Sequence, residues 1–212
     1  MTRAVCARLR KSKWAIGMVL ALVSVAAGGC DDTGNPFAMS LQPFYTKTDL
    51  EADPGLVGTW GDTNGDVSFT FEEGKEKEYA LVVKERDGEQ VNSGEFVAHL
   101  MRLGGWWFID FFPKEKNGGS VFYRAHFLRE HSLARLTLGR DSMQLAFLNA
   151  SWLRARIEEK SIDAPHEKAD ESLLLTGTTQ ELQELAYCYG NDEKAFAEPL
   201  SLERTSAEEE GQ

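Results

Sequence analysis

Short alternating segments separated by turn signals dominate the chain between residues 56 and 148. "VSFTF" at 67–71 alternates apolar with polar residues, and "YALVV" at 79–83 places Tyr79, Leu81 and Val83 on one face. Alternation with a period of two is typical of a strand with one buried face, because successive side chains point to opposite sides of a sheet. The pattern therefore predicts a protein built mainly from sheet.

Dipeptides that end in glycine mark the turns between these segments. Asn64-Gly65, Asp87-Gly88 and Gly104-Gly105 each separate two apolar segments, and such pairs favour tight hairpins because the turn needs positive φ angles. Further strands are expected at 96–101, 106–113, 121–128, 133–138 and 143–148. Seven or eight closely spaced strands predict an antiparallel meander that forms a barrel or a sandwich.

Helical signals appear only later, so one or two C-terminal helices are expected. Asn149 can cap a first helix, and "ESLLLTG" at 171–177 suits one more strand. Thr178 and Glu181 form a capping box for a second helix that Gly190 ends. The apolar face of this second helix holds Leu182, Leu185, Ala186 and Tyr189.

The first 29 residues have the layout of a secretory signal peptide. Five basic residues and no acid come before an apolar run of 14 residues at 14–27. That order, followed by small residues, is typical of a cleaved signal. The run is shorter than the roughly 20 residues that a permanent membrane helix needs.

The residues "AGGC" at 27–30 resemble the bacterial lipobox, in which small residues precede a cysteine that becomes acylated. The resemblance implies cleavage between Gly29 and Cys30 and a lipid anchor on Cys30. Ala27 departs from the pattern, which usually has leucine there. Several acyl chains on one residue anchor a protein stably, so the expected location is the cell envelope, on the inner or the outer membrane.

The rest of the chain divides into a tether at 30–48, a β-rich domain with C-terminal helices at 49–205, and an acidic tail at 206–212. Pro36, Phe37, Pro43, Phe44 and Tyr45 leave a second interpretation of the tether open, in which this segment straps onto the domain surface.

Cleavage changes the charge and the cysteine content. It removes five of the 23 Lys and Arg and none of the 34 Asp and Glu, so the net charge falls from −11 to −16. Such a surface repels nucleic-acid phosphates and anionic headgroups, and no nucleic-acid partner is expected. Cys6 leaves with the signal and Cys30 is acylated, so Cys188 is expected to have no intrachain partner.

Gly58-Thr59-Trp60 at the first strand resembles the Gly-x-Trp motif of lipocalins and related calycins. In those folds the tryptophan plugs the closed end of an eight-stranded barrel, and a late arginine lies across it. Arg154, Arg156 and Arg204 are the candidates for that arginine.

A second resemblance covers nearly the whole mature chain. The blocks "FYTKTDLEADPGLVGTW", "FVAHLMRLGGWWFIDFFP" and "LTGTTQELQEL" resemble uncharacterised bacterial lipoproteins. This likeness implies an exported, anchored β domain, and it brings no known activity.

The segment at 62–73 has two interpretations. Asp62, Asn64, Asp66 and Glu73 stand at positions 1, 3, 5 and 12 of a calcium loop. That loop wants glycine at position 6, where this chain has Val67, the first residue of an alternating strand. The hairpin is therefore favoured, and neither a metal nor a cofactor is expected.

Asp110 is the most unusual residue of the aromatic segment "WWFIDFFP", because an unpaired buried carboxylate is costly. It either contacts a ligand at the mouth of the barrel or pairs with Arg102 or Arg124. The predicted ligand-binding residues are Trp106, Trp107, Phe108 and Asp110.

The function classes narrow to two. No nucleophile elbow, metal-protease helix or phosphate loop occurs in the sequence, so an enzyme is not expected. The first hypothesis is a membrane-tethered module that binds a small apolar molecule. The alternative is an envelope lipoprotein that docks another protein and has no ligand. An exposed apolar patch around Leu182 and Tyr189 favours the alternative, and an interior cavity favours the first.

Overall fold

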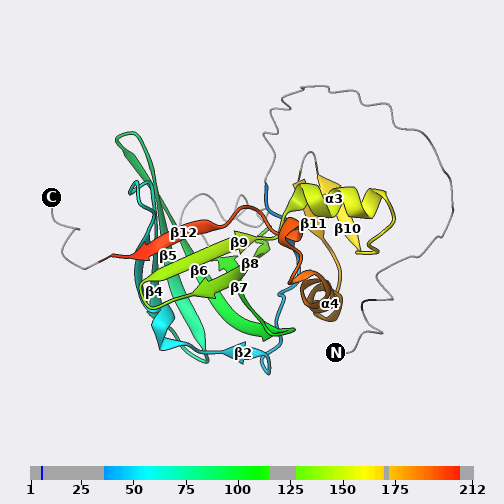
Figure 1. Ribbon diagram of the computed structural model, residues 1–212, viewed down its shortest axis with the longest axis horizontal. Helices are drawn as coiled ribbons and strands as arrows, with labels where there is room; N and C mark the ends of the chain where they lie inside the picture. Colours follow the sequence, from blue (N-terminus) through cyan, green and yellow to red (C-terminus); the bar gives the residue numbers. More distant parts are fainter. Residues whose placement is uncertain (1–5, 7–35, 115–127, 170–171, 206–212) are drawn as a thin grey trace.

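Eight antiparallel strands close into a barrel in the computed structural model, which describes residues 6, 36–114, 128–169 and 172–205 (Figure 1). The strands follow one another around the barrel in chain order from β3 to β9, and β12 closes the ring between β9 and β3. Their bounds are β3 Gly58–Gly61, β4 Val67–Glu73, β5 Glu78–Asp87, β6 Gln90–Leu103, β7 Trp106–Pro113, β8 His131–Leu138, β9 Ser142–Phe147 and β12 Leu200–Arg204. Of the two predicted architectures, the closed calycin-like barrel is confirmed.

Short strands and two helices lie on one side of the barrel, beyond β8 and β9 (Figure 1). β1 pairs with β8 and runs parallel to β11, which pairs with β10, so the sheet continues past the barrel wall. The remaining elements are β1 Met39–Ser40, β2 Leu50–Glu51, η1 Pro54–Leu56, α3 Ala150–Glu158, β10 His166–Ala169, β11 Ser172–Leu175, α4 Thr179–Tyr189 and η2 Glu193–Ala195. No helix in the described part of the chain is long and apolar enough to cross a bilayer.

The predicted hairpins are confirmed where the structure describes them. Val67 donates its backbone N–H to Asp62 Oδ1 at 3.0 Å, and Gly65 has a φ of 74°, so residues 62–66 form a tight turn between β3 and β4. Gly104 and Gly105, at φ 61° and 90°, turn β6 into β7. Glu73 lies at the far end of β4, away from the turn that a calcium loop would need. The strand expected at 121–128 falls almost entirely outside the described residues.

Alternation along the strands produces two separate cores. The barrel core lies inside the barrel, and its larger members are Leu56, Trp60, Phe69, Phe71, Tyr79, Leu81, Leu100, Ile109, Phe111, Leu136, Met143, Leu145 and Leu202. The wall core lies between the outer face of the barrel and the helices, and it includes Phe44, Met101, Phe108, Leu133, Leu148, Leu153, Leu173, Leu182, Leu185 and Phe196. The barrel therefore has a buried outer wall on the helix side, which explains why β7 is apolar on both faces.

Trp60 and Arg204 close one end of the barrel. The Arg204 guanidinium lies 4.1 Å from the centre of the Trp60 ring and donates to the carbonyl oxygens of Val57 at 2.8 Å and Gly55 at 2.6 Å. Gly58 has a φ of 130°, and a Cβ there would lie 2.5 Å from Nη1 of Arg204. Arg204 is thus the late arginine among the three candidates, and Gly58 is a glycine because this guanidinium passes over it.

Both helices start as the sequence predicts. Asn149 accepts a hydrogen bond from the Trp152 N–H, and Thr178 forms a complete capping box with Glu181. Gly190 follows α4, but its φ of −58° is ordinary for any residue. A Cβ at Gly190 would instead meet the Trp106 and Phe108 rings at 3.0 and 3.1 Å. The glycine is therefore required for close packing against β7.

Residues 36–49 lie against the barrel and are called the strap below. Phe44 is fully buried in the wall core and Ala38 is 1% exposed. β1, within this segment, pairs with both β8 and β11. Of the two interpretations of this segment, the strap is therefore observed, and the expectation of a free tether as far as residue 48 is wrong because the aromatic side chains bury themselves.

The structure pairs Cys6 with Cys188 in a disulfide, with the two Cα atoms 5.4 Å apart. The expectation that Cys188 lacks an intrachain partner is therefore wrong for the full chain, because it assumed that Cys6 had already been removed. A polypeptide of residues 30–212 cannot form this disulfide, because it no longer contains Cys6.

Candidate functional site

The open end of the barrel contains a cavity of about 280 Å³, called the mouth cavity. Seven of the eight barrel strands contribute to it, and so does the strap. Its lining residues are Phe37, Met39, Val67, Phe69, Val83, Glu85, Phe96, Phe111, Ser132, Phe147 and Leu200. Trp60 and Arg204 lie at the other end, so the barrel formed by the described residues is closed there and open at the mouth cavity.

Aromatic rings narrow the opening. The Phe37 ring, from the strap, stacks on Phe147 with the ring centres 4.4 Å apart, and Phe111 lies 5.6 Å from the same ring. A second hollow of about 210 Å³ shares Val83, Glu85 and Phe96 with the mouth cavity and continues along the inner side of the β5–β6 hairpin. The cavity thus opens beside this hairpin and beneath Phe37.

The lining suits a small apolar ligand. Nine of its eleven residues are apolar, and the polar members are Ser132 and Glu85. Ligand pockets typically have about 300–1,000 Å³, so this cavity suits a short chain or a single ring system. Glu85 repels an anionic head group at the rim, whereas an uncharged one meets no such penalty.

The four predicted ligand-binding residues lie on different surfaces. Trp106 is 41% exposed at the β6–β7 turn, and Trp107 packs against the barrel core with Arg102 5.5 Å from its ring centre. Phe108 and Asp110 face outward from the barrel. The strand contributes Phe111 to the mouth cavity instead. The aromatic composition pointed to the correct strand, but only the barrel geometry shows which face is interior.

Asp110 is fully buried beneath the strap. Its Oδ2 accepts the Phe44 N–H at 3.1 Å, and its Oδ1 lies 2.7 Å from His131 Nδ1. The expected pairing with Arg102 is wrong, because Arg102 stacks on Trp107 instead. Arg124 lies outside the described residues. The sequence did not indicate the two contacts of Asp110, with the Phe44 N–H and with His131. One of them comes from the strap, and sequence alone did not place the strap.

His99 lies on the same outer face, as its alternation with Ala98 and Leu100 predicts. Its ring stacks on Tyr45 of the strap with the centres 4.2 Å apart, and its Nε2 is 3.4 Å from the Tyr45 hydroxyl. Burial lowers the pKa of His99, although the nearby carboxylates of Asp110 and Glu78 act in the opposite direction. Burial likewise raises the pKa of Tyr45 to about 12, with Asp110 adding to the effect.

These four residues, Tyr45, His99, Asp110 and His131, form the strap cluster. The Asp110–His131 pair has the geometry of two members of a catalytic triad. Ser40, the buried hydroxyl opposite His131 on β1, donates to the Gln42 carbonyl at 2.7 Å. The observed contacts of the cluster hold the strap against β6, β7 and β8, and it is separate from the mouth cavity.

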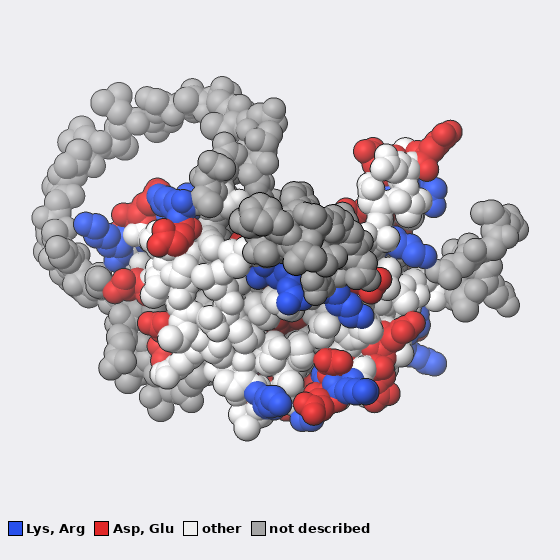
Figure 2. Space-filling model, turned by 180° about the vertical axis from the view of Figure 1, so that it is seen from behind, with Lys and Arg blue, Asp and Glu red and all other residues white. Residues whose placement is uncertain are grey.

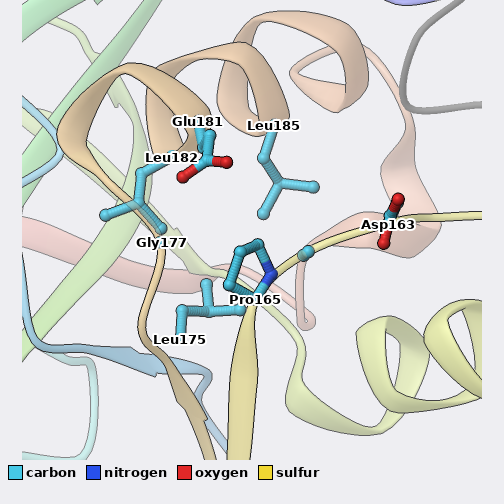
Figure 3. A pocket seen from close by; sticks show the side chains of 8 residues that line it. Asp163, Pro165, Leu175, Gly177, Glu181, Leu182 and Leu185 are labelled. Atoms are coloured by element: carbon cyan, nitrogen blue, oxygen red, sulfur yellow. The ribbon is translucent and has the colours of Figure 1, made fainter.

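The apolar face of α4, whose exposure would have favoured the docking alternative, is covered. Leu182 and Leu185 are 3% and 2% exposed because they pack into the wall core. Figure 3 shows Leu185 pointing toward Pro165, with Leu182 on the same side of the helix above Gly177. The crevice that these residues line has a volume of about 10 Å³. A single water needs roughly that volume, so this crevice is a packing gap and no ligand site.

Charges of both signs are interleaved on the face that Figure 2 shows. Lysine and arginine side chains lie directly beside aspartate and glutamate along its lower edge, and the β5–β6 hairpin projects at the upper right with acidic groups at its tip. In the described part of the chain no three His, Cys, Asp or Glu residues converge as a metal site would require.

Comparisons of the chain with protein-family models, with curated proteins and with solved structures found no match. The barrel and its mouth cavity are compatible with ligand binding.

Proposed function

We propose that this protein is a lipid-anchored lipoprotein of the cell envelope whose barrel binds a small apolar molecule in the mouth cavity. The observation that carries the proposal is the apolar cavity of about 280 Å³ at the one open end of the barrel. A core that filled the barrel completely would leave no such space, because protein interiors pack about as densely as organic crystals.

The anchoring part of the proposal derives from the sequence. The lipobox-like "AGGC" provides Cys30 as the acylated residue, and the strap begins to pack only six residues later, at Pro36. The protein would therefore be held at a membrane by acyl chains, facing an aqueous compartment of the envelope. Metabolic labelling with a fatty-acid analogue tests this, since labelling is expected in the natural chain and not in Cys30→Ala.

A pair of adjacent valines allows a matched test of the cavity. Val83 points into the mouth cavity, whereas Val82 is absent from both cores and points to the opposite side of β5. Val83→Trp places an indole in the cavity, and Val82→Trp adds the same bulk outside. Titration with Nile red, an uncharged dye that fluoresces in apolar sites, measures the binding.

The Kd of the dye for the natural chain and for Val82→Trp is expected to agree within about twofold. Val83→Trp is expected to raise the Kd at least about tenfold, which corresponds to a loss of about 1.4 kcal/mol of binding free energy. Equal binding by all three proteins would place the dye elsewhere and refute the assignment of the site. Native mass spectrometry of cell-extracted protein then identifies the natural ligand by its mass.

A further inference from the structure

The mouth cavity and the start of the strap lie at the same end of the barrel. Phe37 and Met39 line the cavity. The carbonyl of Pro36 accepts the Ala150 N–H at 3.1 Å, and the Ala38 N–H donates to the Leu148 carbonyl at 2.9 Å. These backbone bonds fix the beginning of the strap to the corner between β9 and α3, at the rim of the opening.

The chain between Cys30 and this rim is short. Pro36 lies six positions after Cys30, and an extended chain spans at most about 3.6 Å per position, or about 22 Å in all. The ten residues of β5, tilted as barrel strands are, make the barrel about 25 Å tall. An anchor at residue 30 therefore reaches the open end more easily than the closed end formed by Trp60 and Arg204.

From this geometry we infer that the mouth cavity faces the bilayer and takes up a single-chain, uncharged lipid directly from the membrane. The inference rests on the proposed acylation of Cys30 and ligand binding. Among the described residues, the exposed large hydrophobic side chains are Val91, Trp106 and Leu128. Val91 belongs to the β5–β6 hairpin and Leu128 precedes β8, so two of the three lie at the open end, whereas Trp106 begins β7 at the opposite end. Glu85 at the rim favours an uncharged head group over a carboxylate.

The orientation is measured on the mature, acylated protein in phosphatidylcholine vesicles whose head groups carry a nitroxide quencher. A fluorophore is attached to V91C at the open end or to R140C at the closed end, each with Cys188→Ser so that one thiol reacts. Arg140 is suitable because its side chain is 95% exposed and its carbonyl accepts from Arg204 at 3.4 Å. Versions of both that begin at residue 31, and so lack Cys6, Cys30 and the acyl group, serve as unacylated controls.

Quenching at V91C is expected to exceed that at R140C by at least about twofold, because about 25 Å of barrel separates the two labels. Neither label is expected to be quenched without the acyl group. Equal quenching at both positions, or stronger quenching at R140C, overturns the orientation even if Nile red still binds. Loss of dye binding with the orientation intact would instead remove the proposed ligand function.

The same vesicles decide the source of the ligand. With a deuterated short-chain monoacylglycerol included, native mass spectrometry of the re-extracted protein is expected to show one adduct of that mass, absent from Val83→Trp. The absence of any adduct overturns uptake from the bilayer. If the protein's own acyl chain fills the cavity, the deuterated lipid will fail to bind, which also overturns the inference.

Discussion

Replacement of Arg204 by alanine should destabilise the barrel more than loss of any exposed cation. In the structure its guanidinium bridges the carbonyl oxygens of Gly55 and Val57 and lies 4.1 Å from the centre of the Trp60 ring. The two carbonyls belong to the segment that enters β3, whereas Arg204 is the last residue of β12. One side chain therefore joins the first and last strands where the ring of strands closes.

The contacts set the magnitude. A hydrogen bond from a charged group contributes about 1.5–3 kcal/mol, and the half-buried position of Arg204 argues for the low end of that range. A cation stacked on an aromatic ring adds about 0.5–1 kcal/mol. Arg204→Ala should therefore lower the free energy of unfolding by about 3.5 kcal/mol. Arg204→Lys keeps the charge but not the planar fork, and should recover less than half of the loss.

Urea unfolding followed by tryptophan fluorescence measures these differences. Arg140→Ala is the matched control, because that side chain is almost fully exposed at the same end of the barrel. Its loss should change stability by less than about 0.5 kcal/mol. If Arg204→Ala costs less than about 1 kcal/mol, or no more than Arg140→Ala, the bridge does not stabilise the closed end and the reasoning is refuted.

Three further predictions concern the strap and the cysteines. Asp110→Ala leaves the Phe44 N–H and His131 without their buried partner, so urea unfolding should show a loss of about 3 kcal/mol; a loss below about 1 kcal/mol contradicts this. The pKa of His99 is lowered from 6.5 in the fold, so the unfolded chain binds the extra proton below that pH. Stability should therefore fall as pH drops below 6.5, and His99→Phe should flatten that part of the profile measured by urea titration. Cell-extracted mature protein should carry Cys188 as a free thiol that a maleimide labels without reductant. Labelling of Cys188 only after reduction would contradict this, because the segment that contains Cys6 would then still be attached.

The barrel could be read from the sequence because its determinants are local. Alternation in "VSFTF" and the Asn64-Gly65 turn each need only a few neighbouring residues. Whether the strands form a barrel or a sandwich depends on contacts between residues that are far apart in sequence, because β12 closes the barrel by pairing with both β9 and β3. Gly58 and Trp60 indicated the closed form, but which of three arginines completes the motif became clear only from the contact of Arg204 with the Trp60 ring.

The candidate site was harder to predict for a physical reason. In most strands one face is buried, so alternation shows which side chains point inward. In β7 both faces are buried, because the wall core covers its outer side, and Phe108 and Phe111 look alike in sequence although they face opposite cores. The covering elements come from the strap and from residues after 150, which no pattern within β7 can reveal.

The strap also explains why a carboxylate is retained in this apolar environment. An apolar residue at 110 would pack against Phe44 in several registers with similar burial, because hydrophobic contact has no direction. Asp110 accepts the backbone N–H of Phe44 and therefore matches one register only. β1 lies between Phe37 and Phe44 in the chain, and it pairs with β8 and β11. Phe37 stacks on Phe147 just before β1. The buried polar contact on the outside of the barrel and the pairing of β1 thus hold the same segment, which carries the Phe37 ring at the opening. The polar contact has a cost in desolvation that an apolar pair would avoid.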